Sequence, residues 1–300
     1  MLHLFRILAA AVAASQIAAP LTAAVAPAQR PAASIFIPFD PPLGQRLIYR
    51  KQRIEEKPDG RERSEFTFAI EFRRDDDHYI MTLSPGGAED RAEEPARMQA
   101  ALSRRSFRMS PQGEIVGMID EADYWTALED TAERALGKGA GEVEAVGTRW
   151  AMRQTRELPL RERMHILAGT VMPILFYAGL SVDPEQPIER KDIQTTVLGP
   201  ITGTARTTVE RIARDHVTIT RSWIIPNEQL QEAMDRLSER FGRRPYGLGS
   251  HLISSDNVQR FEIDRRTGLA RSYRSVRSTV TQEGDQRPFS TVTEILERID

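Results

Sequence analysis

The sequence predicts an α+β fold, in which a large curled antiparallel sheet forms an open half-barrel and helices pack in its concave side. Three observations lead to this prediction. Long stretches alternate apolar and polar residues with a period of two, as strands with one buried face do. Tight turn signals join these stretches, which favours an antiparallel meander. Residues 164–182 are apolar on every side, so they need a large apolar surface to cover them.

Residues 164–182, MHILAGTVMPILFYAGLSV, carry no charged side chain apart from one histidine. A transmembrane helix needs about 20 apolar residues, and this stretch is slightly shorter and contains polar residues. We interpret it as a buried helix, with a membrane span as the alternative. Pro173 lacks an amide hydrogen, so we expect a kink or a restart near Met172. Gly179 is a suitable C-terminal stop.

The N-terminus has the pattern of an export signal. Arg6 precedes an Ala-rich apolar run, and Ala26-Pro27-Ala28 fits an A-x-A cleavage site. An uncleaved membrane anchor is the alternative. We assign residues 1–28 to a signal peptide, 29–43 to a Pro-rich tether and 44–300 to a single α+β domain. We therefore expect an exported protein, located in the periplasm.

The first strands follow the tether. A strand over residues 44–55 ends at the turn signal Lys57-Pro58-Asp59-Gly60. The clearest alternation in the chain comes next and places four apolar side chains on one strand face: Phe66, Phe68, Ile70 and Phe72. A strand returns from residue 79. We then predict a helix over 95–104, a hairpin of strands 106–109 and 114–119, and a helix from Asp120 to Leu136 that stops at Gly137.

Strands resume after the central apolar stretch. Segments rich in Thr, Val and Ile predict them, and Asn227 is suited to cap a helix that runs to residue 241. The sequence Asp264-Arg265-Arg266-Thr267-Gly268 predicts a hairpin turn with Gly in the left-handed conformation. The predicted strands cover residues 188–198, 204–213, 216–223, 252–263, 269–282 and 288–299.

Two parts of the chain follow one plan, which suggests an internal duplication of residues 44–180 and 188–300. The sequence Asp77-His78-Tyr79-Ile80-Met81-Thr82 is similar to Asp215-His216-Val217-Thr218-Ile219-Thr220. Each opens a strand after a charged turn, and a helix and a hairpin follow in both halves. Chance similarity between strand–turn–strand units is the alternative interpretation.

The export signal, the meander of long strands and the late hairpin FEIDRRTGLARSY resemble exported bacterial proteins of the half-barrel class, which includes the lipoprotein carrier and its periplasmic relatives. The resemblance covers most of the mature chain by pattern and includes no diagnostic motif. It implies an apolar cavity able to hold acyl chains, and a lipid or lipoprotein partner. It transfers no functional residue.

Composition and motifs exclude several functions. The formal net charge of −2 argues against a general nucleic-acid binder. Without cysteine there is no disulfide, thiol catalysis or zinc–thiolate site. The chain contains no H-E-x-x-H, G-x-S-x-G or phosphate-loop motif. We interpret Asp75-Asp76-Asp77-His78 as a solvated turn rather than a metal site, and we expect no cofactor and no catalytic residue.

Three functional hypotheses remain. The first is a non-enzymatic exported protein that binds an apolar ligand or an envelope partner. Its candidate cavity is lined by the apolar strand face and by a histidine beside the apolar stretch: Phe66, Phe68, Ile70, Phe72 and His165. The second is a structural or assembly factor whose own helix fills its core. The third is a hydrolase with an unrecognised site.

Overall fold

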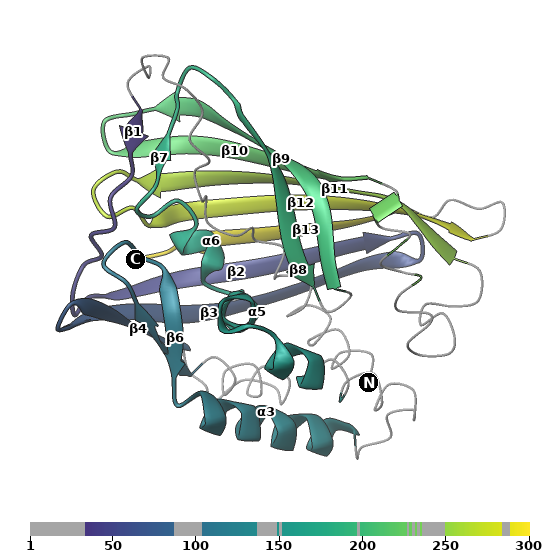
Figure 1. The fold of residues 1–300 in the computed structure, drawn as a ribbon, viewed down its shortest axis with the longest axis horizontal. Helices are drawn as coiled ribbons and strands as arrows, with labels where there is room; N and C mark the ends of the chain where they lie inside the picture. Colours follow the sequence, from purple (N-terminus) through teal and green to yellow (C-terminus); the bar gives the residue numbers. More distant parts are fainter. Residues whose placement is uncertain are drawn as a thin grey trace.

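The protein is built on one large antiparallel sheet that is not closed into a barrel (Figure 1). The computed structural model describes residues 34–86, 104–136, 149, 152–196, 199–226, 228–229, 232, 235, 250–283 and 289–300. Eleven strands lie in the order β6-β5-β4-β3-β2-β13-β12-β11-β10-β9-β8. Their bounds are β2 Arg46–Lys57, β3 Gly60–Asp75, β4 His78–Pro85, β5 Arg105–Met109, β6 Ile115–Ile119, β8 Ile188–Thr196, β9 Gly199–Ile212, β10 His216–Ile225, β11 Ser250–Asp264, β12 Ala270–Glu283 and β13 Phe289–Arg298.

The sheet consists of two consecutive meanders joined in its middle. One runs from β2 to β6 and the other from β8 to β13, and the antiparallel pair β2–β13 links them, with Lys51 opposite Leu296. The strands of this sheet that come first and last in the sequence, β2 and β13, are therefore neighbours. Strands β6 and β8, which flank the helical middle of the chain, are its two edges. The antiparallel sheet and most strand positions agree with the prediction.

The apolar face predicted for β3 is buried. Phe68, Ile70 and Phe72 are fully buried, whereas Phe66 is partly exposed. They join inward-facing residues of neighbouring strands in one hydrophobic core, and Tyr49 of β2 stacks on Phe68 with ring centroids 5.7 Å apart. Burying a large apolar side chain contributes about 1.5–3 kcal/mol, so this face is a main source of stability.

The helix predicted over residues 164–182, with a kink or restart near Met172, is shorter and more interrupted in the structure. The structure has α5 at Leu160–Leu167, a turn, the short helix α6 at Met172–Leu175, further turns, and the two-residue strand β7 at Ser181–Val182. The restart at Met172 was expected, because Pro173 lies in the first turn of α6 and lacks the N–H needed within a helix. The stretch is nevertheless buried, and its apolar side chains belong to the same core as the sheet.

Helix α3, Glu121–Leu136, has the predicted bounds and is held to α5. The Arg163 guanidinium of α5 donates to the Glu121 carboxylate at 2.6 Å, and Trp125 Nε1 donates to the same carboxylate at 3.0 Å. Helix α5 contacts β6, and α6 contacts β12. In Figure 1 these short helices lie in front of β2 and β3, with β6 and β8 on either side.

Part of the predicted tether belongs to the fold. The strand β1, Ile35–Phe36, pairs with β7, and Ile37 and Phe39 are buried in the core. This segment also crosses the β11–β12 hairpin, where Gly268 has φ +74° and a Cβ would meet the carbonyl oxygen of Pro38. The prolines in this segment suggested an extended linker. The apolar residues Ile37 and Phe39 between them instead anchor the segment in the core.

Some predictions fall outside the described residues. The helix over 95–104 lies in an undescribed part of the chain, and only four positions of the helix over 227–241 are described, all of them helical. The two halves share a meander order, which every meander has, so the duplication stays a prediction. Among the described residues, no helix combines the length and apolar character needed to cross a bilayer.

Candidate functional site

A groove of about 1070 Å³ lies where the sheet is open. One wall is the β5–β6 turn and β6, from Gln112 to Val116, and the other comes from β8, β9 and β10. Helix α5 and residues 172–182 form the floor. We call this the seam groove, because the two sheet edges flank it. Its volume is slightly above the usual range of about 300–1,000 Å³ for small-molecule pockets, which leaves room for a ligand of lipid size.

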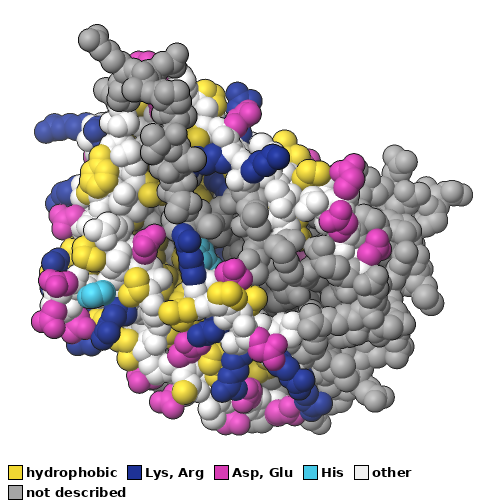
Figure 2. All heavy atoms as spheres, in the orientation of Figure 1, with side chains coloured by type: hydrophobic (Ala, Val, Ile, Leu, Met, Phe, Trp, Pro, Cys, Tyr) yellow, Lys and Arg dark blue, Asp and Glu magenta, His cyan; other side chains and the backbone are white. Residues whose placement is uncertain are grey.

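The floor and the β6 wall of the seam groove are mainly apolar. Met164 of α5 and Leu175 of α6 contribute, although both are mostly buried in the core below. Met172 is half-buried, and Leu160 and Val116 expose 48% and 39% of their surface. Apolar side chains at the surface beside a concavity are typical of binding sites. Figure 2 shows hydrophobic side chains next to Lys and Arg on this face of the molecule.

The wall formed by β8, β9 and β10 is cationic. Arg190 and Lys191 on β8 and Arg221 on β10 line this wall. Arg161 adds a fourth basic side chain from the α5 floor, and Glu114 is the only acid among the described lining residues. Cations in a concave apolar site attract an anionic ligand, because the low-dielectric walls strengthen the field. The groove therefore has an apolar part and a positive part.

Arg190 faces into the curl of the sheet. It lies opposite Ala205, which in turn lies opposite Trp223, and both partners are buried. The Arg190 side chain is half-buried and has no hydrogen-bond or ion-pair partner among the described residues. Burial lowers the pKa of its guanidinium. No carboxylate within the described part of the chain offsets this cost.

Arg221 lies one row nearer the core, with Thr207 opposite it on β9 and Gln259 opposite it on β11. Its side chain is 3% exposed, donates to Gln259 Oε1 at 3.1 Å, and lies 5.4 Å from the ring centroid of Phe176. Gln259 Nε2 in turn donates to the Tyr273 hydroxyl at 3.4 Å. These contacts hold the guanidinium in place at the inner end of the seam groove.

Tyr177 is a buried residue of the groove floor. Its ring packs edge-on against Phe176 and Phe261, and only 4% of its surface is exposed. The hydroxyl has no hydrogen-bond partner, and burial raises its pKa to about 12. The nearby Thr207 side chain lowers the pKa of this hydroxyl in part, but the two groups do not meet the geometry of a hydrogen bond. A buried hydroxyl without a partner is costly.

The structure separates the predicted site residues. His165 lines the seam groove from α5, whereas Phe66, Phe68, Ile70 and Phe72 are absent from its described lining. The side chains of Phe68, Ile70 and Phe72 instead pack against other core residues. Sequence reasoning did not identify Arg190, Arg221 or Tyr177. The available signal was a set of basic side chains in otherwise Thr- and Ile-rich strands, but the register between neighbouring strands had to be known first.

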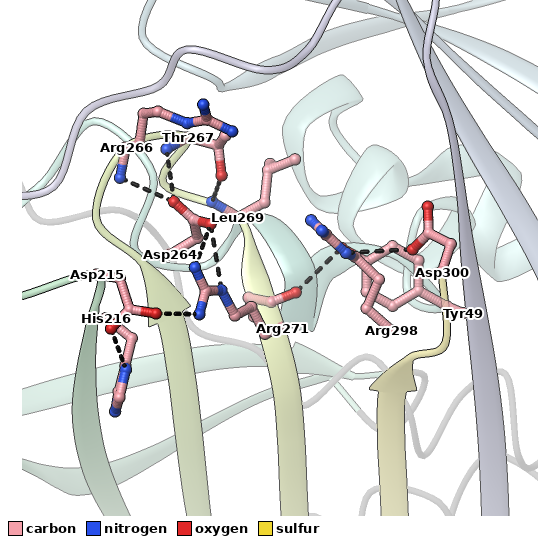
Figure 3. Close-up of polar contacts among 11 residues, drawn as sticks. Tyr49, Asp215, His216, Asp264, Arg266, Thr267, Leu269, Arg271, Arg298 and Asp300 are labelled. Atoms are coloured by element: carbon pink, nitrogen blue, oxygen red, sulfur yellow. Dashed lines mark hydrogen bonds and ion pairs between the residues drawn. The ribbon is translucent and has the colours of Figure 1, made fainter.

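The densest polar cluster of the described residues lies at the β11–β12 turn (Figure 3). Asp264 Oδ1 accepts the backbone N–H groups of Arg266 and Thr267, and Asp264 Oδ2 accepts Arg271 Nη2 at 2.7 Å. Arg271 also donates to Asp215 at 2.6 Å, and Asp215 contacts His216 Nδ1 at 3.0 Å.

This cluster fixes the turn rather than forming a catalytic site. Arg271, together with His216, lowers the pKa of Asp215 to about 2. Burial alone would raise the pKa of Asp264, but Arg271 and the two N–H groups lower it overall. Both carboxylates are thus held in the charged form by structural partners, which makes them weak bases. The Thr267 hydroxyl accepts the Leu269 N–H at 3.3 Å and so belongs to the turn as well.

Asp75-Asp76-Asp77-His78 forms the turn between β3 and β4. Asp76 has φ 51°, and Asp75 lies 3.7 Å from the guanidinium of Arg108. Among the described residues, no three potential ligands from His, Asp and Glu lie together as a metal site would require.

The comparisons with known proteins do not assign the chain to a family. No protein-family model matches it, and neither does any curated protein. A similar solved structure is that of Rv2717c from M. tuberculosis, with 8% sequence identity, 84% of this chain and 91% of that chain covered, and a TM-score of 0.23. A TM-score this low carries no argument about this chain.

Proposed function

We propose that this chain is an exported, non-enzymatic protein whose seam groove binds an apolar ligand with an acyl chain, such as a lipid or the lipid part of a lipoprotein. The observation that carries the proposal is the groove itself, with its volume of about 1070 Å³ and the apolar side chains on its floor and on the β6 wall. A concave, largely preformed and mostly apolar site is the usual form of a small-molecule site.

The proposal treats the sheet as an open half-barrel, with α5 and α6 in its concave side. In such an architecture the helices occupy the inner face of the strands, and the ligand occupies the gap between the sheet edges. The burial of Met164, Leu167 and Leu175 together with Phe68 and Phe72 supports this arrangement. The ligand site would then be the seam groove and not the face of β3.

The test is whether lipid accompanies the protein. We expect acyl lipids in a solvent extract of mature protein purified without detergent from a bacterial periplasm, and we expect the delipidated protein to bind 1-decanol in calorimetry. Met172→Trp, which places a larger side chain in the groove, should reduce both signals. Ile212→Trp, at a β9 position with 49% exposure and outside the groove lining, is the matched control. Wild-type protein that carries no lipid and does not bind 1-decanol would contradict the proposal.

A second candidate function is a structural or assembly factor with a self-filled core. The burial of Phe68, Ile70 and Phe72 in one core with the helical segment favours it, because these side chains are in contact with protein rather than exposed to a ligand. The same experiment separates the two candidates. An absence of lipid and of 1-decanol binding, in protein that is folded and monodisperse, would support the structural function.

A further inference from the structure

We infer that the ligand of the seam groove is an amphiphile with an anionic head group, a phosphate monoester or a carboxylate. Its head would lie at Arg190, Arg221 and Tyr177, and its chain would lie along α5, α6 and β6. The inference rests on the proposed function, because it concerns the same groove. It adds the charge of the ligand and its orientation.

The first argument is the unusual position of Arg190. Two other basic residues on the inner face of the sheet, Lys51 and Arg53, approach the Glu294 carboxylate at 3.5 and 3.6 Å. Burial would raise the pKa of Glu294, but the neighbouring Lys and Arg side chains lower it, so the carboxylate is charged and balances them. Arg190 is half-buried without such a partner among the described residues. An anionic ligand would supply one.

The second argument is independent of charge. The Tyr177 hydroxyl is buried in the groove floor without a hydrogen bond, and natural proteins rarely leave such groups unsatisfied. Thr207 and Arg221 line the same groove, and both lower the pKa of the Tyr177 hydroxyl against the effect of burial. A phosphate or carboxylate oxygen at this point would accept from the hydroxyl and from the guanidinium together.

The third argument is the division of the groove into two parts. The described basic side chains on the sheet side of the lining are confined to β8 and β10, whereas the β6 wall contributes Ile115 and Val116, and the floor contributes Met172. A neutral chain alone would leave the Arg190 guanidinium partly dehydrated and unpaired, which is unfavourable. A ligand with its charge at one end fits both parts.

The experiment compares three ligands of wild-type mature protein by isothermal titration calorimetry: decyl phosphate, 1-decanol and inorganic phosphate. Decyl phosphate and 1-decanol share the chain, and decyl phosphate and inorganic phosphate share the anion. We expect decyl phosphate to bind at least about tenfold more tightly than 1-decanol, as a hydrogen-bonded charge pair predicts, and inorganic phosphate to bind too weakly to measure.

Variants locate the head group. Arg190→Gln should remove most of the preference for decyl phosphate and leave 1-decanol affinity unchanged. Arg206→Gln is the matched control, because Arg206 lies on the same pair of strands but on the opposite face, exposed and 3.7 Å from Glu189. Tyr177→Phe should weaken decyl phosphate binding several-fold and should not lower the melting temperature of the ligand-free protein, since it removes a buried hydroxyl that has no partner.

Each remaining outcome has a clear meaning. Equal binding of decyl phosphate and 1-decanol, or a preference that survives Arg190→Gln, would overturn the anionic head group and leave the apolar groove intact. Binding of neither decyl compound would overturn the proposed function as well. Inorganic phosphate that binds as tightly as decyl phosphate would indicate a site for a free anion, and would overturn the amphiphile.

Discussion

At the turn between β11 and β12, the carboxylate of one residue, Asp264, binds two backbone N–H groups and the guanidinium of Arg271. Arg271 extends the network to Asp215 at the start of β10, so a single side chain connects three consecutive strands. The turn also supports Asp40, whose N–H donates to the Thr267 carbonyl at 3.1 Å. The contacts of Asp264, Arg271 and Asp215 in Figure 3 therefore fix the turn end of the second meander.

This network predicts a pH-dependent stability. The folded-state pKa values of Asp264 and Asp215 lie below their unfolded values. The stability that the two carboxylates contribute is therefore fully present above a pH of about 4. It is lost as the pH falls through the folded value, about 2 for Asp215. We expect Arg271→Gln to lower the melting temperature at pH 7, and we expect the difference from wild type to shrink below a pH of about 4. Thermal unfolding across that pH range is the measurement.

A surface arginine gives the control for this pH series. Arg61→Gln changes an exposed pair with Glu56 at 3.5 Å, and such pairs contribute little. It should have a small effect at every pH. If the Arg271→Gln difference stayed constant down to a pH of about 2, the carboxylates would not be the source of its effect.

At the scale of elements, the sequence predicted strands better than it predicted the helical segment. The alternation of apolar and polar residues in β3 indicated one buried face, and that face is buried in the structure. Residues 164–182 are apolar throughout and carry no such period, so their composition indicated burial without indicating conformation. Pro173 indicated the restart at α6, whereas the strand β7 depends on tertiary packing, because it pairs with β1 from the predicted tether.

The candidate site was less predictable than the fold. Register places Arg190 in line with Ala205 and Trp223, across three strands of the second meander. No periodicity of one strand reveals such a row, because it depends on which strands are neighbours and how they align. The apolar side chains of β3 were an attractive candidate because they were the clearest apolar set. Phe68, Ile70 and Phe72 are however fully buried, and none of the four lies in the described lining of the groove.

Helix α5 provides a matched pair of positions for testing its role in the core. Leu167 is 4% exposed and Leu160 is 48% exposed, and both lie in the same helix. Leu167→Asp buries a carboxylate among apolar groups, so we expect the free energy of unfolding to fall by about 3 kcal/mol or more. Leu160→Asp should change it by about 0.5 kcal/mol. Chemical denaturation of the two variants is the measurement, and equal small effects would mean that α5 is not part of the core.

At the scale of the whole molecule, the first and last strands that the chain adds to the large sheet, β2 and β13, lie side by side. Strands β2 and β13 pair along eight residues, from Thr291 opposite Glu56 to Arg298 opposite Tyr49. The two meanders therefore meet through long-range pairing, whereas the helical middle of the chain lies between the two edges of the sheet. This arrangement leaves β6 and β8 apart, and the seam groove lies between them. The site is thus a consequence of topology rather than of any local motif.

The expected export requires a cleavage point that leaves the fold intact. Ile35 and Phe36 form β1, and Ile37 and Phe39 are core residues, so cleavage at any point from residue 35 onward would remove parts of the fold. The A-x-A signature places the cut after Ala28, which preserves all of them. We expect N-terminal sequencing of protein recovered from the periplasm to begin at Gln29. Ala26→Leu should block this processing, because the signature requires a small residue there, and Ala33→Leu, which lies outside the signature, should not. Protein that is recovered outside the membrane with Met1 intact would contradict the signal peptide.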